Sequence, residues 1–526
     1  MLKTRRAMHL ILGAFTEGED DMEVFNPSTG QAIGTVPITL PRHVNLEEMG
    51  RWAHSAQEAW HWEVPEQLKE AVFQAIAVNF EIYRGELAKT MVIESGKLWR
   101  WADAEVQEVI DTIWHYHGEI SRYHTKDGFG RCQLSDKNAF SVLMPYGNFL
   151  TIKPWNFPAA VPMWSICGAL AGGNSILVKP AEQTPFTMEL VAKTVKKSLA
   201  DVLDKTMVRK LEGLIQTVNG IGHSVGKRLL EDYDYDKVTF TGSDITGKIV
   251  AQTAGSRLKP CHLELGGHAA MVVLDDFDID LAVQEAINAN LGDSGQRCVS
   301  TRVVFVQESR YKEFLEKYLS VARARRIGNP MDLETEMGPL ISKEQLEQVH
   351  NMVVETGIQS GRQPLIGGHL LKGSGYFYPP TVFTEVPYGM TAMDNEIFGP
   401  VIVINPLSGR NREEAFWNAV ELVNRSKYGL SNALLTNDRR LSSCASGRFK
   451  TGIFYIGRGT TGAELNKYFG GVKSSGWGRE GRGLDDWTQV QQVYDDYHGK
   501  PRMAQSGGVD QETLKRILSS HSRLDS

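Results

Sequence analysis

A regular alternation of apolar runs with helical segments begins at Asn148, and it constrains the fold of this chain more than any other feature. Strands are expected at FLTIKP, SILVKP, IQTVNG, KVTFTG and HLELGG, because short runs rich in β-branched residues favour strands. Helices are expected between them over 158–171, 185–199, 224–231 and 244–254. Strands that alternate with helices form a parallel sheet with helices on both faces, so the sequence predicts an α/β domain.

A second series of the same kind follows Cys298. Strands are predicted at TRVVFV, VIVINP, SNALLT and TGIFYIG, and helices at 309–322 and 343–355. We therefore expect a second α/β domain. A chain of 526 residues is too long for one hydrophobic core, which agrees with several domains.

The segments outside these two series have patterns of their own. Residues 8–37 predict two short strands joined by a turn at 26–30, and residues 45–124 have helical periodicity. Residues 127–145 predict a hairpin that leaves the main body. Residues 498–526 are polar and serine-rich, and we expect them to be a loosely attached tail.

Composition argues against several classes of protein. A net charge of −6 gives no reason to expect nucleic acid, which requires a basic face. Residues 156–178 are uncharged and long enough to cross a bilayer, but prolines and glycines divide them into a helix, a turn and a strand, so no membrane span is predicted. Five cysteines without a CxxC pair predict no metal site and no disulfide framework, and they favour the reducing cytoplasm.

Polar side chains stand where three of the predicted strands end. Asn156 follows FLTIKP, Lys179 and Glu182 follow SILVKP, and Ser243 follows KVTFTG at the start of a helix. Parallel sheets bind ligands beyond the carboxyl ends of their strands, and a helix N-terminus suits a pyrophosphate. Each feature alone is weak, and a structural role would be the default without a full GxGxxG. Their shared placement favours a dinucleotide site.

Cys298 and Glu264 are the candidate nucleophile and general base. Cys298 lies in GQRC before a buried strand, so we expect a loop or a helix start to present its thiol. Glu264 lies in LELGGH, far upstream, so only the fold can bring the two side chains together. Glu264 could instead be a structural carboxylate, but the glycine pair after it indicates close backbone approach. The other cysteines are interpreted as small buried hydrophobic residues: Cys132, Cys167, Cys261 and Cys444.

Seven motifs resemble those of the aldehyde dehydrogenase superfamily, in its NAD(P)-dependent, non-acylating form. They are PWNFP at 154–158, GNSILVKPAEQTP at 173–185, FTGSDITG at 240–247, LELGGH at 263–268, GQRC at 295–298, EIFGP at 396–400 and FGGVKSSGWGREG at 469–481. The match runs from about residue 10 to about residue 495, with all seven in order at compatible spacings.

The resemblance implies a three-part fold. Residues 8–126 and 146–263 would form a Rossmann-like NAD(P)-binding domain, and residues 264–462 a catalytic α/β domain. Residues 127–145 and 475–497 would form a small β arm for oligomerisation. Members of the family assemble, so a homodimer or homotetramer is expected.

The resemblance also implies a reaction, the oxidation of a small-molecule aldehyde to its carboxylic acid. The Cys298 thiolate would attack the aldehyde carbon, and the Asn156 side chain with the Cys298 backbone N–H would stabilise the oxyanion. A hydride would leave for the nicotinamide, and a thioester would remain on the cysteine. Glu264 would then activate the water that hydrolyses this thioester.

The cofactor implied is NAD, with NADP as the alternative. Glu182 favours NAD, because a carboxylate accepts from a ribose 2′-hydroxyl and repels a 2′-phosphate. The residues implied at the cofactor are Ile152, Trp155, Lys179, Glu182, Gly222, Gly242, Ser243, Gly247, Leu265, Glu396 and Phe398.

Three residues are candidates for the substrate side. Trp164 either lines a channel or only packs in the core. Arg297 and Arg458 suggest a semialdehyde or another polar aldehyde with a remote anionic group. Alternatively, Arg297 lowers the pKa of the cysteine or pairs with a structural carboxylate.

Two other functions stay open. In a CoA-acylating enzyme a thiol rather than water would resolve the thioester, and Glu264 argues against this route. A catalytically silent, structural member of the family would not need Cys298, Glu264 and Asn156 together.

Overall fold

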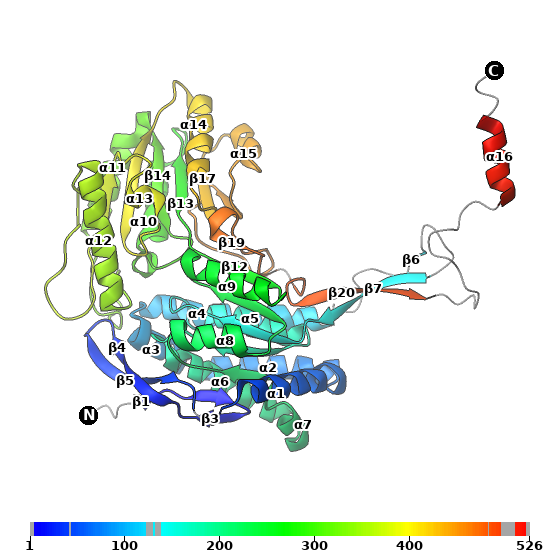
Figure 1. Cartoon of the computed structure of the whole chain (residues 1–526). Coiled ribbons are helices and arrows are strands. Elements are labelled where there is room, and N and C mark those ends of the chain that lie inside the picture. The colour runs from blue at the N-terminus through cyan, green and yellow to red at the C-terminus, as the bar shows by residue number, and fades with distance from the viewer. Residues whose placement is uncertain are drawn as a thin grey trace.

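The computed structural model describes residues 5–41, 44–121, 130–131, 138–481, 483–495 and 511–521. An eight-stranded sheet forms the core of the lower part of the molecule in Figure 1, in the order β3-β2-β10-β9-β8-β11-β12-β19. The five strands from β10 to β12 run parallel, as predicted, and the edge strands run antiparallel. The strands are β2 (His9–Ile11), β3 (Ala14–Thr16), β8 (Asn148–Ile152), β9 (Ser175–Lys179), β10 (Ile215–Thr217), β11 (Lys237–Thr241), β12 (Cys261–Glu264) and β19 (Gly476–Trp477).

Helices cover both faces of this sheet because its central strands are apolar on both faces. Along β8, Phe149 packs into one core and Leu150 into the opposite core, as the two-residue period of a strand requires. The Phe149 face carries α2 (Glu66–Ile82), α4 (Trp99–Ile120), α5 (Ala160–Ala171) and α6 (Pro185–Val202). The Leu150 face carries α1 (Leu46–Glu58), α8 (Lys227–Asp232) and α9 (Asp244–Ser256).

The uncharged segment 156–178 is part of this core. It forms α5, a turn and then β9, as the sequence predicted. In the part of the chain that the structure describes, no helix is both long and apolar enough to span a membrane.

The second series forms a six-stranded, fully parallel sheet above the first in Figure 1, in the order β15-β16-β14-β13-β17-β18. Its strands are β13 (Ala269–Val273), β14 (Thr301–Gln307), β15 (Thr381–Thr384), β16 (Val401–Leu407), β17 (Ser431–Leu435) and β18 (Ile453–Ile456). Around it lie α10 (Ile279–Leu291), α11 (Glu308–Arg323), α12 (Lys343–Ser360), α13 (Thr391–Asp394), α14 (Arg412–Arg425) and α15 (Arg439–Ala445). The predicted α/β fold class is therefore confirmed in both series.

The N-terminal region differs from the prediction of two strands. Residues 8–37 form four strands, because a turn at 12–13 and a break at 17–18 divide the first predicted strand into three, and a further strand, β1, precedes them. Strands β2 and β3 join the edge of the large sheet, while β1 (Arg5–Arg6), β5 (Gln31–Thr39) and β4 (Glu19–Asn26) form a separate small sheet. The predicted turn at 26–30 is present, with Gly30 N–H donating to Asn26 O over 2.8 Å. The remaining helices of this half are α3 (Arg84–Ser95) and α7 (Lys205–Lys210).

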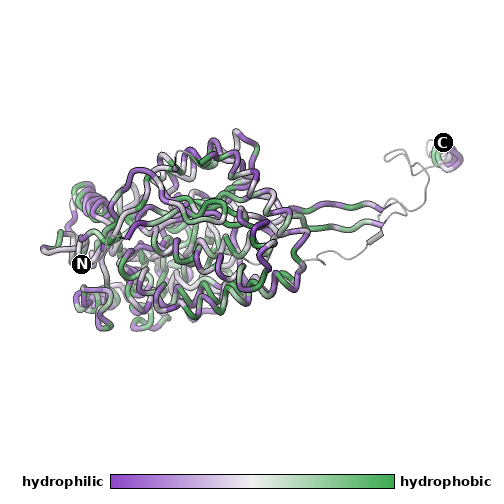
Figure 2. Tube along the Cα trace, turned by 90° about the horizontal axis from the view of Figure 1, so that it is seen from below, coloured by the Kyte–Doolittle hydropathy of each residue, from purple (hydrophilic) through white to green (hydrophobic). Residues whose placement is uncertain are grey.

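A narrow β ribbon extends away from both sheets (Figures 1 and 2). It contains β6 (Gly130–Arg131), β7 (Asn138–Pro145) and β20 (Thr488–Asp495), with β20 and β7 paired antiparallel along eight residues. Residues 127–129 and 132–137 of the predicted hairpin lie outside the described residues. Of the predicted tail, the structure describes a helix, α16 (Gln511–His521).

Candidate active site

The turn that carries Cys298 is built from residues in an unusual backbone conformation. Helix α10 ends at Leu291, and Asp293 and Ser294 follow with φ of 54° and 55°, in the left-handed region that costs a non-glycine residue about 1–3 kcal/mol. Gly295 follows at φ 74°, where a Cβ would lie 2.1 Å from the Gly399 carbonyl oxygen. The cysteine thus follows a helix end and lies in a turn, so of the two expected settings, a loop or a helix start, the loop is the one present.

This turn brings Asn156 and the glycine pair of LELGGH to the cysteine. The Asn156 side-chain amide donates to the Gln296 carbonyl over 2.9 Å. A Cβ on Gly267 would lie 2.0 Å from the Cys298 carbonyl oxygen, so only glycine fits there. The close backbone approach predicted from the glycine pair is confirmed.

Cys298 is half-buried, and its thiol lies in an electronegative setting. Burial raises its pKa to about 12, and the carboxylates of Glu396 and Glu264 raise it further, while the Arg302 guanidinium opposes them. Cys298 precedes β14 of the six-stranded sheet, whereas Glu264 ends β12 of the eight-stranded sheet. The fold therefore brings the two predicted side chains within electrostatic reach of each other, from different sheets.

Glu264 is buried, and only one of its two carboxylate oxygens has a hydrogen-bond partner. Its Oε1 accepts a hydrogen bond from His262 Nε2 over 2.9 Å, and its Oε2 has no hydrogen-bond partner. Burial raises the pKa of Glu264 to about 7, against the lowering effect of His262. A buried carboxylate with a pKa near neutrality and a free oxygen is suited to accept a proton.

The sequence analysis missed the partner of this carboxylate. His262 stands two residues before Glu264 on β12, so the two side chains share one face of the strand. That spacing was visible in the sequence, but the residue that holds His262 from its other side, Asp486, lies 224 positions away.

The predicted cofactor residues lie at or near the carboxyl ends of strands of the large sheet. Strands β11, β8 and β9 are neighbours, and the chain leaves β8 on one side to form β9 and returns on its other side to form β11. The carboxyl ends of strands at such a reversal are where open parallel sheets bind ligands. Ile152 is the last residue of β8 and stands at this reversal.

Two sets of polar side chains lie at these strand ends: Lys179 with Glu182, and Ser243. Lys179 Nζ lies 3.0 Å from Glu182 Oε2 and donates to the Pro180 carbonyl over 2.8 Å. Ser243 is the N-cap of α9, where its hydroxyl accepts from Thr246 N–H over 3.2 Å. The residues predicted for a ribose and a pyrophosphate therefore stand at the carboxyl ends of β9 and β11, the two strands that flank β8.

Close packing explains the predicted glycines near these strand ends. A Cβ on Gly247 would lie 2.4 Å from the Leu265 side chain, and one on Gly242 would lie 2.6 Å from the Phe240 ring. Gly222 begins a short π-helical turn, Gly222–Gly226, and has open space where a side chain would stand. Gly222 thus leaves room beside the helix for a ligand.

Glu396 and Phe398 connect these strand ends with the cysteine. Glu396 Oε1 lies 3.9 Å from the Arg302 side chain and has no hydrogen-bond partner. Burial raises the pKa of Glu396 to about 7. The ring of Phe398 packs edge-on against Trp155, with centroids 5.5 Å apart. A buried acceptor without a donor, beside the cysteine, fits a ribose hydroxyl. The residues present therefore fit a dinucleotide.

A cavity of about 550 Å³ opens beside Trp164. Trp164 packs edge-on against Phe469, with centroids 5.3 Å apart. Glu108 of α4, which the sequence analysis did not single out, also lines the cavity, and burial raises its pKa to about 7. The further charged residues on its wall are Arg84, Arg100, Asp103, Asp111, Glu464 and Lys467.

The two predicted substrate arginines lie differently. The Arg297 guanidinium stacks over the Trp101 ring at 4.4 Å, and its buried Nε has no hydrogen-bond partner. Arg458 is exposed and donates to the Thr461 carbonyl over 3.1 Å. Of the described residues, those that line the cavity include neither of these two arginines.

Comparison with known proteins agrees with this geometry. The sequence model of the aldehyde dehydrogenase family matches residues 15–493. Mitochondrial aldehyde dehydrogenase of Rattus norvegicus is 34% identical over 480 residues, covering 89% of this chain and 87% of the relative. Peroxisomal aminoaldehyde dehydrogenase 1 of Pisum sativum is 31% identical over 477 residues, covering 89% of this chain and 91% of the relative.

A solved structure shares the whole architecture. The NAD⁺ complex of an aldehyde dehydrogenase from Bacillus cereus superposes with a TM-score of 0.84 at 29% identity, covering 94% of this chain and 97% of that one. The matched residues include strands of both large sheets and of the ribbon. They also contain the motifs that carry the site residues. The chain belongs to the aldehyde dehydrogenase family.

Proposed function

We propose that the protein oxidises a polar aldehyde to its free carboxylic acid with NAD, through a thioester on Cys298. One observation carries the proposal: the Cys298 thiol and the buried Glu264 carboxylate, which has one free oxygen, come from two different sheets and interact electrostatically, and the Asn156 amide bonds to the backbone two residues before the cysteine. A nucleophile, a base and an oxyanion donor together support acyl chemistry.

The first step joins the cysteine sulfur to the aldehyde carbon. The Cys298 thiol loses its proton to solvent, a C–S bond forms as the carbonyl π bond breaks, and the carbonyl oxygen becomes an oxyanion. One N–H of the Asn156 amide is committed to Gln296, which leaves the second N–H to donate to this oxyanion. The Cys298 backbone N–H, which faces its own sulfur, is the second donor.

The second step oxidises the carbon and the third releases the acid. Bound NAD⁺ supplies the acceptor for the hydride that leaves the substrate carbon. Glu264 Oε2 then accepts a proton from water, the hydroxide oxygen attacks the thioester carbon, and the C–S bond breaks. The carboxylate leaves and Cys298 is restored.

The cofactor residues support NAD over NADP. Lys179 is committed to Glu182 and to a backbone carbonyl, and burial lowers its pKa. The Glu182 carboxylate therefore keeps its ability to accept from a ribose 2′-hydroxyl and to repel a 2′-phosphate. Within the site, Phe398 and Trp155 would flank the nicotinamide end and Ser243 the pyrophosphate.

The charged wall of the cavity supports a polar substrate. Glu108 is buried beside Trp164, and Arg84 is already paired with Asp103 over 2.7 Å. A polar tail of the aldehyde would meet charges of both signs there, which disfavours long hydrocarbon chains. This supports a polar aldehyde without fixing the sign of its charge.

Glu264 supports water rather than CoA as the acceptor of the acyl group, because a thiol acceptor has less need of a base at that position. We also propose assembly as a homodimer or homotetramer through the ribbon, and a cytoplasmic location. The four cysteines in the described residues are all free, which suits a reducing compartment.

The test is NADH formation with a panel of aldehydes in the absence of CoA. Succinic semialdehyde, 4-aminobutanal and hexanal sample anionic, cationic and apolar tails. We expect turnover and acid product with a polar aldehyde, and a lower kcat/KM for hexanal. Turnover that requires CoA would reject hydrolysis, and a clear preference for hexanal would reject the polar substrate.

A further inference from the structure

His262 lies between the buried carboxylate of Glu264 and the half-buried carboxylate of Asp486. It is 1% exposed, its Nε2 lies 2.9 Å from Glu264 Oε1, and its Nδ1 bonds to Asp486 Oδ2. A neutral imidazole carries one N–H and could donate to only one of these oxygens. Only the imidazolium, with a hydrogen on both nitrogens, satisfies both carboxylates.

The surrounding chain fixes the ring in this position. A Cβ on Gly478 would lie 3.0 Å from His262 Cγ, so the backbone there packs directly on the imidazole. Asp486 is in turn held by Lys237 Nζ, 3.0 Å from its Oδ1. The ring and its anchor therefore have little freedom to rotate away from Glu264.

The negative and positive charges around His262 are equal in number when His262 is protonated. Three carboxylates surround it: Glu264 on the same strand, Asp486, and Glu480. Two lysines offset the other negative charges, because Lys153 lies 3.2 Å from Glu480 and Lys237 pairs with Asp486. A positive His262 completes the balance of three negative and three positive charges. In agreement, these partners raise the pKa of His262 to about 10 against burial, and His262 and Lys237 lower that of Asp486 to about 2.

We propose that His262, held by Asp486, is a positioning residue that keeps the general base Glu264 ionised and oriented; this inference rests on the proposed function. By donating to Oε1, the imidazolium leaves Oε2 as the oxygen that takes a proton from water. It also offsets the burial that disfavours the carboxylate form. His262 touches neither substrate nor cofactor in this scheme and acts only through Glu264.

The experiment separates the thioester-forming step from hydrolysis across a range of pH. The burst of NADH reports thioester formation, and the steady-state rate reports hydrolysis when that step is slow. The variants are His262→Gln, which keeps a donor but loses the charge of the imidazolium, and Asp486→Asn, which keeps the size of the anchor and one acceptor oxygen but loses its negative charge.

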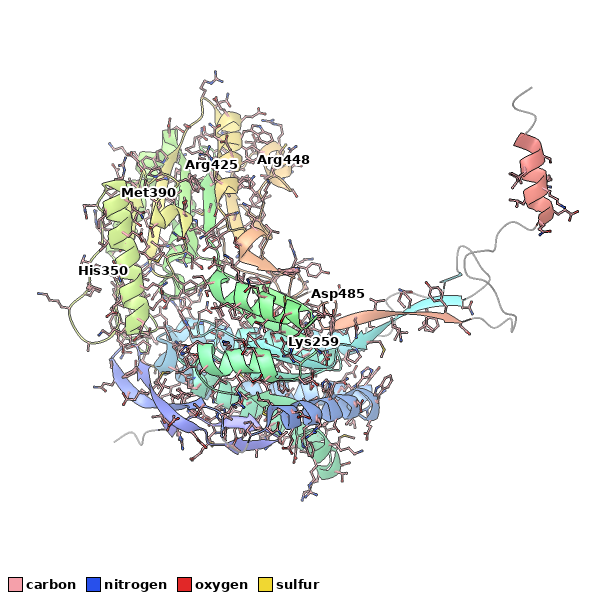
Figure 3. All side chains as sticks on the ribbon, in the orientation of Figure 1. Lys259, His350, Met390, Arg425, Arg448 and Asp485 are labelled. Atoms are coloured by element: carbon pink, nitrogen blue, oxygen red, sulfur yellow. The ribbon has the colours of Figure 1, made fainter. Side chains whose placement is uncertain are left out.

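Two matched control variants leave the contacts among His262, Glu264 and Asp486 intact. His350→Gln changes a half-buried histidine that bonds to Tyr378, on α12 and well apart from Asp485 in Figure 3. Asp485→Asn changes the neighbouring aspartate, which accepts from Tyr468 instead.

In both test variants, we expect the acidic limb of the pH profile of the steady-state rate to move to higher pH. An opposite charge at this distance shifts a carboxyl pKa by about 1–3 units, so His262→Gln should move the limb by about that much. The burst should remain, and the rate should recover at alkaline pH, which a merely structural defect would not produce. The controls should keep the wild-type limb.

An unchanged acidic limb in a folded His262→Gln or Asp486→Asn variant would overturn the positioning role. If the histidine variant does not fold, Asp486→Asn alone decides, because it leaves the ring in place. A wild-type enzyme that makes no NADH with any aldehyde would overturn the proposed function itself, and this inference with it.

Discussion

Burial sets the acid–base behaviour of the residues at this site. Glu264, Glu396 and Glu108 all have a pKa raised to about 7, and in each case burial is the largest cause. An ordinary glutamate would be ionised well below neutrality and would be a weaker base. The site therefore holds carboxylates that change protonation within the physiological range.

The pH dependence of hydrolysis follows from Glu264. Its raised pKa means that the base is protonated, and unable to accept a proton, as pH falls through about 7. We predict a steady-state rate that is full on the alkaline side and falls tenfold per pH unit well below that point. The profile with a polar aldehyde measures it. A flat rate down to a pH near the ordinary glutamate pKa would contradict the assignment.

Cofactor choice is tested at Glu182. In Glu182→Gln the Lys179 partner and the charge that repels a 2′-phosphate are both lost. We predict that the ratio of kcat/KM for NADP to that for NAD rises by roughly tenfold, equivalent to ~1.4 kcal/mol. Glu189→Gln, a buried glutamate on α6 bonded to Met8, is the control and should leave the ratio unchanged. An unaltered ratio in Glu182→Gln would exclude this residue from cofactor selection.

Residues that belong to one local motif could be predicted, and residues joined only by the fold could not. Glu182, Lys179 and Ser243 stand at or just after strand ends, so parallel topology alone places them at the same side of the sheet. Asp486 reaches His262 across most of the C-terminal half of the chain, and no local pattern indicates that contact. The predicted substrate side depended on Arg297 and Arg458, and the contact of the Arg297 guanidinium with the Trp101 ring is another that no local pattern indicates.

Among the elements, regular strands and helices matched their sequence patterns best. β8, β9, β11 and β12 lie where alternating or continuous apolar runs predicted them, because burial on both faces leaves a strong signal. The prediction did not include β13, β15, α10 or α14. β13 has the short run AAMVV, whose alanines carry little strand preference, and only pairing with β14 and β17 fixes it.

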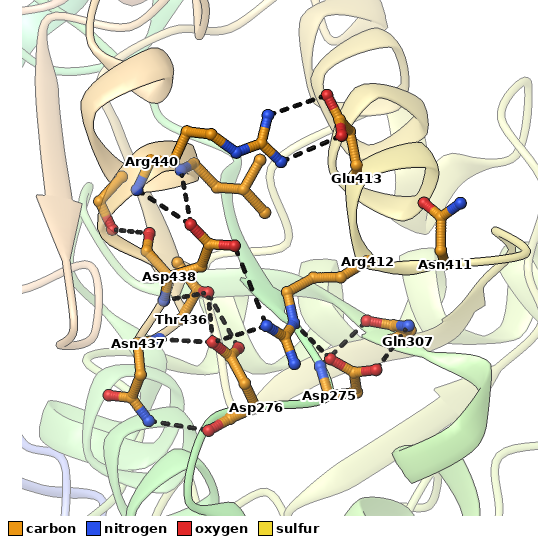
Figure 4. Close-up of polar contacts among 12 residues, drawn as sticks. Asp275, Asp276, Gln307, Asn411, Arg412, Glu413, Thr436, Asn437, Asp438 and Arg440 are labelled. Carbon is orange, nitrogen blue, oxygen red and sulfur yellow. Dashed lines mark hydrogen bonds and ion pairs between the residues drawn. The ribbon is translucent and has the colours of Figure 1, made fainter.

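The ends of β13 and β17 are joined to α14 by one arginine (Figure 4). Arg412 Nε lies 2.6 Å from Asp275 Oδ1, and its Nη1 lies 3.5 Å from Asp276 and 3.9 Å from Asp438. These carboxylates follow two neighbouring strands and would repel each other without the guanidinium. The arginine therefore stabilises the carboxyl edge of the second sheet.

We predict that Arg412→Met lowers the free energy of unfolding by about 1–2 kcal/mol, the range for charge-assisted bonds reduced by solvent screening. Chemical denaturation measures it, with NADH formation unchanged because this edge lies outside the catalytic residues. Arg410→Met is the matched control, since Arg410 is exposed and pairs only with Glu414 among the described contacts. Equal stability of both variants would show that the network does not stabilise the sheet.

At the scale of the molecule, the active site exists because two sheets meet. β12 lies next to the edge strand β19 of the eight-stranded sheet, and the four residues from Leu265 to His268 lead from it into β13 of the six-stranded sheet. Glu264 and Cys298 therefore lie on opposite sides of one junction. The sequence predicted two α/β units, but their mutual placement depends on contacts such as Gly267 against Cys298 that no periodicity reveals.

The ribbon is the clearest candidate for assembly. Val490 and Tyr494 of β20 are 58% and 65% exposed on a strand that leaves the body (Figure 2). Exposed apolar side chains on an extended strand pair favour a second protein surface. We predict that the wild type is larger than the 58.6 kDa chain and that Val490→Asp shifts it towards that mass.

Light scattering coupled to size-exclusion chromatography measures the change. Gln491→Asp places the same charge on the opposite face of β20 and should alter the mass less. A wild type that elutes as a single chain would contradict assembly through the ribbon.

The central claim is that Cys298 carries the acyl group and Glu264 releases it. Intact-protein and peptide mass spectrometry of Glu264→Gln, mixed with NAD and a substrate aldehyde, tests this most directly. The account predicts one acyl group per site, attached to Cys298, accumulating because hydrolysis has lost its base, and no adduct in Cys298→Ala. An acyl group on Cys444 or another residue, or acid product from Cys298→Ala, would contradict it.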